Sequence, residues 1–269
     1  MTVHGEVRAW QTISTVAIIA LAVAGTTLGL FYEGLYTDPE ILLHQAYGQD
    51  TVTLLAVVPL LAIGLGLARR GSLRGYILWL GGLGYMAYTY AVYAVITQFN
   101  EFFLGYVALF GLSSFTLAAG VLEIDPDVVK ERLEERLPVK AVVGFFVGMS
   151  TLISLLWLSE ILPATLADEP PPSIEGTGVP ANVVHVLDLG VLIPAMFVTG
   201  YWLYNGRPWG YVLSGVFFVK LTSIGVAVLT MIVWMHFEGY SVRIAEILIF
   251  TILTVLNATF AIVYYWAIR

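Results

Sequence analysis

Long apolar runs recur along the whole of this sequence, and they constrain its fold more than any other feature. A run of about 18 or more apolar residues can cross the hydrocarbon core of a bilayer, which is about 30 Å thick. Hydrophobic residues make up 59% of the 269 residues and charged residues 12%, far from the balance of a soluble domain. The sequence therefore predicts an all-α polytopic integral membrane protein. The eight predicted transmembrane helices cover residues 11–32, 51–68, 76–97, 102–122, 140–161, 183–204, 209–234 and 244–267.

Composition also excludes several kinds of site and partner. Because nearly all of the chain is predicted to lie in the membrane, we expect no soluble domain, and the net charge of −7 does not suggest a nucleic-acid partner. The absence of cysteine excludes disulfides, a thiolate nucleophile and an iron–sulfur cluster. His44, His185 and His236 match no metal-binding spacing, so neither a metal nor a cofactor is predicted. The expected partners are membrane lipid and an unidentified small molecule or ion, and the oligomeric state is left open.

Basic residues predict the orientation of the chain. With eight transmembrane helices, ten lysines and arginines fall on one side, and only Arg243 falls in a loop on the other. Basic residues are enriched in cytoplasmic loops, so both termini are predicted to be cytoplasmic, in the plasma (inner) membrane. The ten residues are Arg8, Arg69, Arg70, Arg74, Lys130, Arg132, Arg136, Lys140, Arg207 and Arg269.

The two halves of the chain share a residue pattern, repeated at a constant offset of half the chain length. We expect two four-helix halves, 1–122 and 139–269, joined by a cytoplasmic amphipathic linker, 123–138. Four helices are an even number, so the halves have the same orientation, as in transporters with parallel repeats. The matched residues are Pro59, Gly71, Gly75 and Tyr76 in the first half and Pro194, Gly206, Gly210 and Tyr211 in the second.

Asp188 and Lys220 are ionisable residues deep within two predicted transmembrane helices that share one turn. The first of these helices runs from Asp188 to Tyr204 before the turn, and the second runs from Trp209 after the turn to Lys220. At about 1.5 Å per residue, Asp188 is about 24 Å and Lys220 about 17 Å from the turn, so the two side chains can pair. A lysine at this depth must pair or lose its proton. A structural ion pair and a functional site both remain open.

Further candidates lie in the predicted outer half of the membrane. Asp50 is expected to follow a short interfacial helix that Asp38 and Pro39 start. Tyr85 and Tyr88 share a helix face and either pack or line a polar cavity. The other candidates are Glu33, Glu160 and His185, of which the two glutamates can also be plain interfacial residues.

The lysine invites comparison with retinal proteins, whose Schiff-base lysine also lies on the seventh helix. Microbial rhodopsins have an aspartate four residues before that lysine, whereas this sequence has Val216, and 76–97 contains no carboxylate. We therefore do not expect a retinal site.

Four segments resemble those of an uncharacterised family of prokaryotic polytopic membrane proteins. The resemblance covers most of the chain and implies the architecture, but no activity. The segments are QAYGQD (45–50), ARRGSLRG (68–75), VLDLG (186–190) and RPWGYVL (207–213).

Three kinds of function fit these features. The leading hypothesis is a small permease or channel-like protein, with an outward-facing polar cavity that ends at Asp188 and Lys220 and with coupling to protons. The alternative is a membrane-embedded enzyme that uses Glu33, Glu160 and Asp188 as acid catalysts on a lipidic or isoprenoid substrate; no catalytic residue is assigned. A non-catalytic assembly subunit is the third. No nucleotide-binding motif is present, which excludes ATP-driven pumping by this chain alone.

Overall fold

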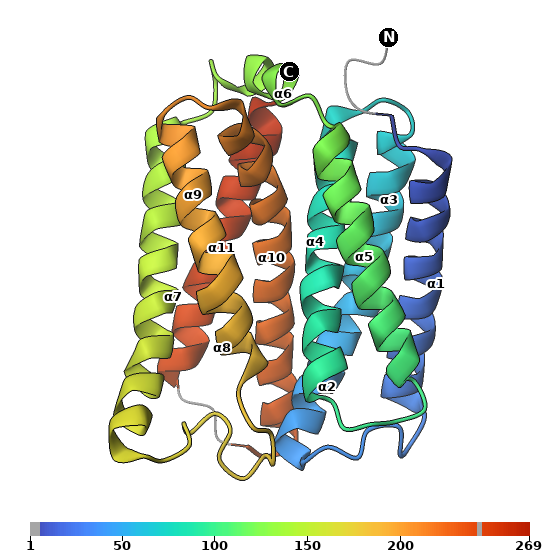
Figure 1. Cartoon of the computed structure of the whole chain (residues 1–269), viewed down its shortest axis with the longest axis vertical. Helices are drawn as coiled ribbons and strands as arrows, with labels where there is room; N and C mark the ends of the chain where they lie inside the picture. The colour runs from blue at the N-terminus through green and yellow to red at the C-terminus, as the bar shows by residue number, and fades with distance from the viewer. Residues whose placement is uncertain (1–5, 241–243) are drawn as a thin grey trace.

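The computed structural model describes residues 6–240 and 244–269, and within these ranges the chain forms helices and turns without a β-strand. The long helices run side by side in one bundle, and α1 begins and α11 ends at the end of the bundle that carries α6 (Figure 1). In chain order the elements are α1 (Ala9–Phe31), α2 (Glu40–Val52), η1 (Thr53–Val57), α3 (Val58–Ala68), α4 (Leu73–Ile96), α5 (Phe103–Glu123), α6 (Pro126–Leu133), α7 (Val139–Ala167), α8 (Val183–Leu187), η2 (Asp188–Leu192), α9 (Ile193–Tyr204), α10 (Pro208–Phe237) and α11 (Ile244–Ala267).

Seven helical stretches among the described residues are long and apolar enough to cross a membrane, so the chain is a multi-pass membrane protein. The predicted helix 76–97 is not among the seven. It corresponds to α4, whose 24 residues are long enough but include many glycines and tyrosines, which lower the mean hydropathy. Most of α4 is buried between α3, α5 and α10, so neighbouring helices rather than lipid cover these residues.

Two of the membrane-crossing stretches contain a π-helical turn, η1 in one and η2 in the other. Each is followed by a proline, Pro59 or Pro194, at the start of the next α-helix. A proline within a helix has no N–H to donate and clashes with the carbonyl four residues before it, and one wider turn relieves both problems. The wider turns begin at Thr53 and at Asp188.

The prediction of a separate interfacial helix before Asp50 is wrong. The segment forms the first turns of a helical stretch that continues to Ala68, and Leu42–Ala68 is the membrane-crossing part. Pro39 rather than Asp38 is the N-cap residue, and Asp38 instead accepts a hydrogen bond from the backbone N–H of Gln98 (2.9 Å). Asp50 therefore lies inside the bundle, 3% exposed, rather than at its mouth.

The middle of the bundle is formed by α4 and α10, which pack along each other (Figure 1). Gly81 of α4 lies against the side chain of Val219, where a larger residue would clash. α2 also packs on α10, because Gly48 leaves room for the backbone of Met231.

The connection between α5 and α7 carries the short helix α6. Asp125 caps it, accepting hydrogen bonds from the backbone N–H groups of Asp127 and Val128, and Pro126 is its first residue. Val129 and Leu133 are fully buried, so the helix packs its apolar face on the bundle. This helix is shorter than the predicted linker 123–138.

Candidate functional site

Asp188 is the first residue of the π-helical turn η2, and the residue is buried, 6% exposed. Both carboxylate oxygens accept hydrogen bonds from neutral aromatic donors. The hydroxyl of Tyr88 on α4 donates to Oδ1 (2.8 Å), and the indole Nε1 of Trp157 on α7 donates to Oδ2 (2.9 Å). The carboxylate is thus held between two helices that are distant in the sequence.

Lys220 on α10 is also 6% exposed, and its Nζ is buried without a hydrogen-bond partner. The Nζ atom lies 4.0 Å from the centroid of the Tyr88 ring, within the range of a cation–π interaction. The predicted direct pair between Asp188 and Lys220 is not among the ion pairs within 4.0 Å of the described residues. Tyr88 links the two groups instead, because its ring faces the amine and its hydroxyl bonds the carboxylate.

His185 and Glu160 lie beside this pair. His185, on α8, packs its ring on Trp157 at 4.6 Å between centroids and is 6% exposed. Its Nε2 lies 3.7 Å from Oε2 of Glu160, which is close enough for an ion pair but too far for a hydrogen bond. Glu160 also accepts a hydrogen bond from the backbone N–H of Ser173 (2.7 Å), which links the connection between α7 and α8 to α7.

Asp50 forms a second buried carboxylate site. The hydroxyl of Tyr36 donates to Oδ2 (2.7 Å) and that of Tyr93 donates to Oδ1 (3.0 Å). Gly29 of α1 makes room for this carboxylate, because a Cβ atom there would meet Oδ2. No lysine, arginine or histidine forms an ion pair with Asp50 among the described residues.

The remaining candidates do not join Asp188. Tyr85 interacts with neighbours within the N-terminal half of the chain: its hydroxyl accepts from Nε2 of Gln49 (2.6 Å) and lies 2.9 Å from the hydroxyl of Thr53. Tyr85 and Tyr88 therefore serve different clusters despite their shared helix. Glu33 is exposed in the turn after α1. The structure thus brings Asp188, Lys220, Tyr88, His185 and Glu160 together, and leaves the other three candidates, Tyr85, Asp50 and Glu33, elsewhere.

Trp157 has no role in the sequence-based hypotheses, although it supplies half of the hydrogen bonds to Asp188. A tryptophan N–H that is removed from water usually donates to an acceptor. The presence of Trp157 in an apolar helix therefore indicated that some acceptor lies nearby, but not that the acceptor is Asp188. Tyr36 and Tyr93 were missed in the same way. A tyrosine partner for a specific carboxylate becomes visible only when the helices are assembled.

Among the described residues, no group of three or more histidines, cysteines, aspartates or glutamates has an arrangement that could hold a metal ion. The Asp188 cluster, which we define as Asp188, Lys220, Tyr88, Trp157 and His185, offers hydrogen-bond donors and one carboxylate. Such a set suits proton transfer and the binding of a polar solute.

No protein-family model, curated protein or solved structure matches this chain. The chemistry of the cluster and the arrangement of the helices are therefore the basis for a functional proposal.

Proposed function

We propose that this chain is a small proton-coupled permease or channel-like protein of a prokaryotic plasma membrane, with the Asp188 cluster as its working site. The single observation that carries the proposal is a buried lysine without a hydrogen bond, held over Tyr88 next to a carboxylate. Charged groups inside a membrane are costly, and they commonly mark ion pathways and proton relays. If Asp188 and Lys220 had a purely structural role, we would expect them to form a direct ion pair, whereas the described residues show none between them.

The second element of the proposal is an architecture of eight transmembrane helices in two repeated halves, with α4 as the eighth. The π-helical turns support it, because they begin at Thr53 and at Asp188, and these residues are matched at the same offset as Pro59 and Pro194. Gly75 and Gly210, another matched pair, meet equivalent atoms. Gly75 lies against Leu67 and Ala68, and Gly210 lies against Trp202 and Leu203.

Contacts between the proposed halves are reciprocal. α2 of the first half packs on α10 of the second, and α8 of the second half packs on α4 of the first. In the repeat, α2 corresponds to α8 and α4 corresponds to α10, so a twofold axis along the membrane normal exchanges the two contacts. The cluster lies at one of them, because Tyr88 belongs to the first half and Asp188 to the second.

The positions of the basic residues support a cytoplasmic location for the end of the bundle that carries α6. Arg74 donates a hydrogen bond to the carbonyl of Ile268 (2.6 Å), and Arg269 forms an ion pair with Glu135 (2.7 Å). The C-terminus therefore lies beside the connections between α3 and α4 and between α5 and α7, which carry many of the basic residues. The positive-inside rule assigns this end of the bundle to the cytoplasm. Both termini are then cytoplasmic.

Protonation of Asp188 is the step that we propose to drive transport. A neutral Asp188 no longer stabilises the ammonium of Lys220, which then has only the ring of Tyr88 as its partner. A change in charge at a point where the halves meet shifts the balance between two arrangements of those halves. In this way, proton binding on one side of the membrane is coupled to movement of a solute between the halves.

The enzyme alternative requires Glu33, Glu160 and Asp188 to converge on an apolar pocket. Glu33 is exposed in a turn, and Glu160 is engaged with Ser173 and His185, so the geometry favours the permease. An assembly subunit without transport activity is distinguished from a permease by the following experiment.

The test is proton flux into proteoliposomes that contain a pH-sensitive dye, driven by an inside-negative potassium diffusion potential, with and without a panel of polar solutes outside. We expect wild-type protein to acidify the vesicles, and we expect Asp188→Asn and Lys220→Met to reduce the flux at least about tenfold, which is about 1.4 kcal/mol. Glu175→Gln, in the outer loop, is the matched control and keeps the flux. Wild-type flux in both cluster variants would refute the proposal.

A further inference from the structure

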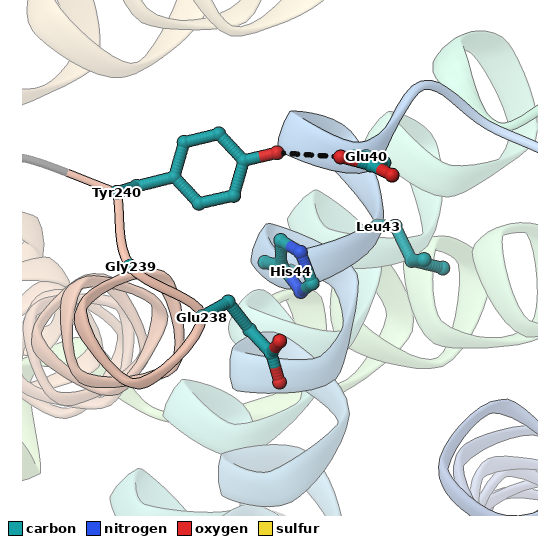
Figure 2. Close-up of a pocket in the computed structure, with 6 residues that line it drawn as sticks. All are labelled: Glu40, Leu43, His44, Glu238, Gly239 and Tyr240. Carbon is teal, nitrogen blue, oxygen red and sulfur yellow. Dashed lines mark hydrogen bonds between the residues drawn. The ribbon is translucent and has the colours of Figure 1, made fainter.

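A second candidate site lies where α2 begins and α10 ends, at the end of the bundle opposite α6 (Figure 1). An open pocket of about 380 Å³ is formed there by six residues from both segments. They are Glu40, Leu43, His44, Glu238, Gly239 and Tyr240, and Figure 2 shows the imidazole of His44 between Glu238 and Tyr240. The pocket therefore joins the N-terminal half of the chain to the C-terminal half.

His44 is the least satisfied group of this pocket. His44 is 9% exposed, and its Nδ1 is buried without a hydrogen-bond partner. Its ring contacts other aromatic rings, with the centroid of Tyr240 at 5.4 Å and that of Tyr47 at 6.2 Å. A buried imidazole nitrogen normally has a hydrogen-bond partner, so His44 is a polar group at this pocket that the protein itself leaves unsatisfied.

The two glutamates give the pocket a negative charge. The hydroxyl of Tyr240 donates to Oε2 of Glu40 (3.0 Å), which uses the one hydroxyl donor among the lining side chains. The pKa of Tyr240 is raised, first by this hydrogen bond, then by desolvation and by the negative charges of Glu40 and Glu238. The side-chain groups left for a ligand are the two carboxylates, of Glu40 and Glu238, which are hydrogen-bond acceptors.

We propose that this pocket binds a small organic cation with N–H donors, of the alkylammonium or diamine class. Ammonium groups donate to carboxylates in charge-assisted hydrogen bonds, and the rings of His44 and Tyr240 provide faces for the carbon chain. A metal ion fits less well, because no three metal-ligating side chains converge among the described residues. This proposal depends on the pocket alone and does not require the transport function proposed above.

The experiment is NMR of the full chain labelled with ¹⁵N-histidine, in detergent micelles. The sequence has four histidines, so the His44 signals can be assigned with the single variant His44→Gln. We expect 1,4-diaminobutane to shift the His44 signals saturably, with a dissociation constant below about 10 mM. Tetramethylammonium has the same charge per nitrogen but no N–H group, and it should bind at least about tenfold more weakly.

Matched variants separate the pocket from general surface charge. Glu40→Gln and Glu238→Gln should each weaken diamine binding about tenfold. Glu169→Gln removes one exposed carboxylate from the outer loop and should leave binding unchanged.

Three results would overturn the proposal. The first is a wild-type His44 signal that does not shift saturably with the diamine. The second is equal weakening by Glu169→Gln, which would indicate diffuse attraction by surface charge. The third is saturation by tetramethylammonium at the same concentration as the diamine, since the N–H donors would then have no role.

Discussion

Removing the Tyr88 hydroxyl is the perturbation that tests the geometry of the Asp188 cluster most selectively. Tyr88→Phe deletes the hydrogen bond to Oδ1 of Asp188 (2.8 Å) and keeps the ring that faces Nζ of Lys220. The substitution therefore separates the hydrogen bond from the cation–π contact. It also removes only one oxygen atom, so packing around α4 is preserved.

The expected cost follows from the kind of hydrogen bond that is lost. Hydrogen bonds to charged groups contribute about 1.5–3 kcal/mol in soluble proteins, whereas side-chain hydrogen bonds within membranes average about 0.6 kcal/mol and reach about 1.7. Asp188 is 6% exposed and keeps its bond from Trp157, so water cannot readily replace the lost donor. We expect Tyr88→Phe to lower the free energy of unfolding by about 1–2 kcal/mol.

The assay is a double-mutant cycle, with unfolding by sodium dodecyl sulfate titrated in mixed micelles. Tyr88→Phe combined with Asp188→Asn should show a coupling energy of about 1 kcal/mol. Tyr85→Phe is the matched control on the same helix, because its hydroxyl interacts with Gln49 and Thr53 rather than with Asp188. Its coupling to Asp188→Asn should stay within about 0.5 kcal/mol of zero. Equal coupling in the two cycles, or none in either, would refute the arrangement.

Three further predictions concern charge, packing and pH. Lys220→Met should lower the free energy of unfolding by no more than about 2 kcal/mol, since Nζ loses its contact with the Tyr88 ring but no hydrogen bond, whereas a loss of about 3–5 kcal/mol in the same titration would indicate a structural ion pair. Gly75→Ala and Gly210→Ala should each cost about 1–3 kcal/mol, because the added Cβ meets helix backbone, and Gly66→Ala, which faces open space in α3, should cost nothing in the same assay. Burial raises the pKa of Asp38 above 3.8, so the folded chain binds more protons than the unfolded chain in the pH range just above that value. The free energy of unfolding should therefore fall as the pH rises through this range. Thermal unfolding curves recorded at several pH values should show this fall in the wild type, and Asp38→Asn should remove the contribution of Asp38 to it.

Hydropathy predicted most of the fold, because a helix that crosses a membrane pairs its backbone N–H and C=O groups within itself and exposes mainly apolar side chains along its length. The predicted helix 183–204 coincides with the stretch Val183–Tyr204, and 102–122 differs from α5 by one residue at each end. The prediction failed where polar residues are buried against partners. The membrane-crossing stretch that contains Asp50 begins at Leu42 rather than at the predicted position 51, because tyrosine hydroxyls satisfy that carboxylate.

The candidate site was predictable in depth but not in detail. The helical rise per residue predicted that Asp188 and Lys220 lie at similar distances from the turn between their helices, and in the structure both belong to one cluster. The rotation of each helix about its axis depends on packing, here on close contacts such as that between Gly81 and Val219. For this reason no spacing argument could show that the ring of Tyr88 links the two charges, or that Trp157 completes the cluster from another helix.

The pocket between the start of α2 and the end of α10 could not be predicted from the sequence either. His44 and Tyr240 belong to opposite halves of the chain, yet their rings lie 5.4 Å apart between centroids. Contact between them depends on the packing of α2 along α10, which Gly48 permits. No local motif in either segment indicates the other.

The most direct test of the central claim is to compare proton flux through Asp188→Glu and Asp188→Asn in proteoliposomes of equal protein content. Both variants preserve a polar side chain at the first residue of η2, but only glutamate keeps a group that binds and releases a proton. If Asp188 carries the proton, the glutamate variant retains measurable flux and the asparagine variant has none above that of empty vesicles. Flux at the wild-type rate through Asp188→Asn, in protein shown to be folded, would contradict the account.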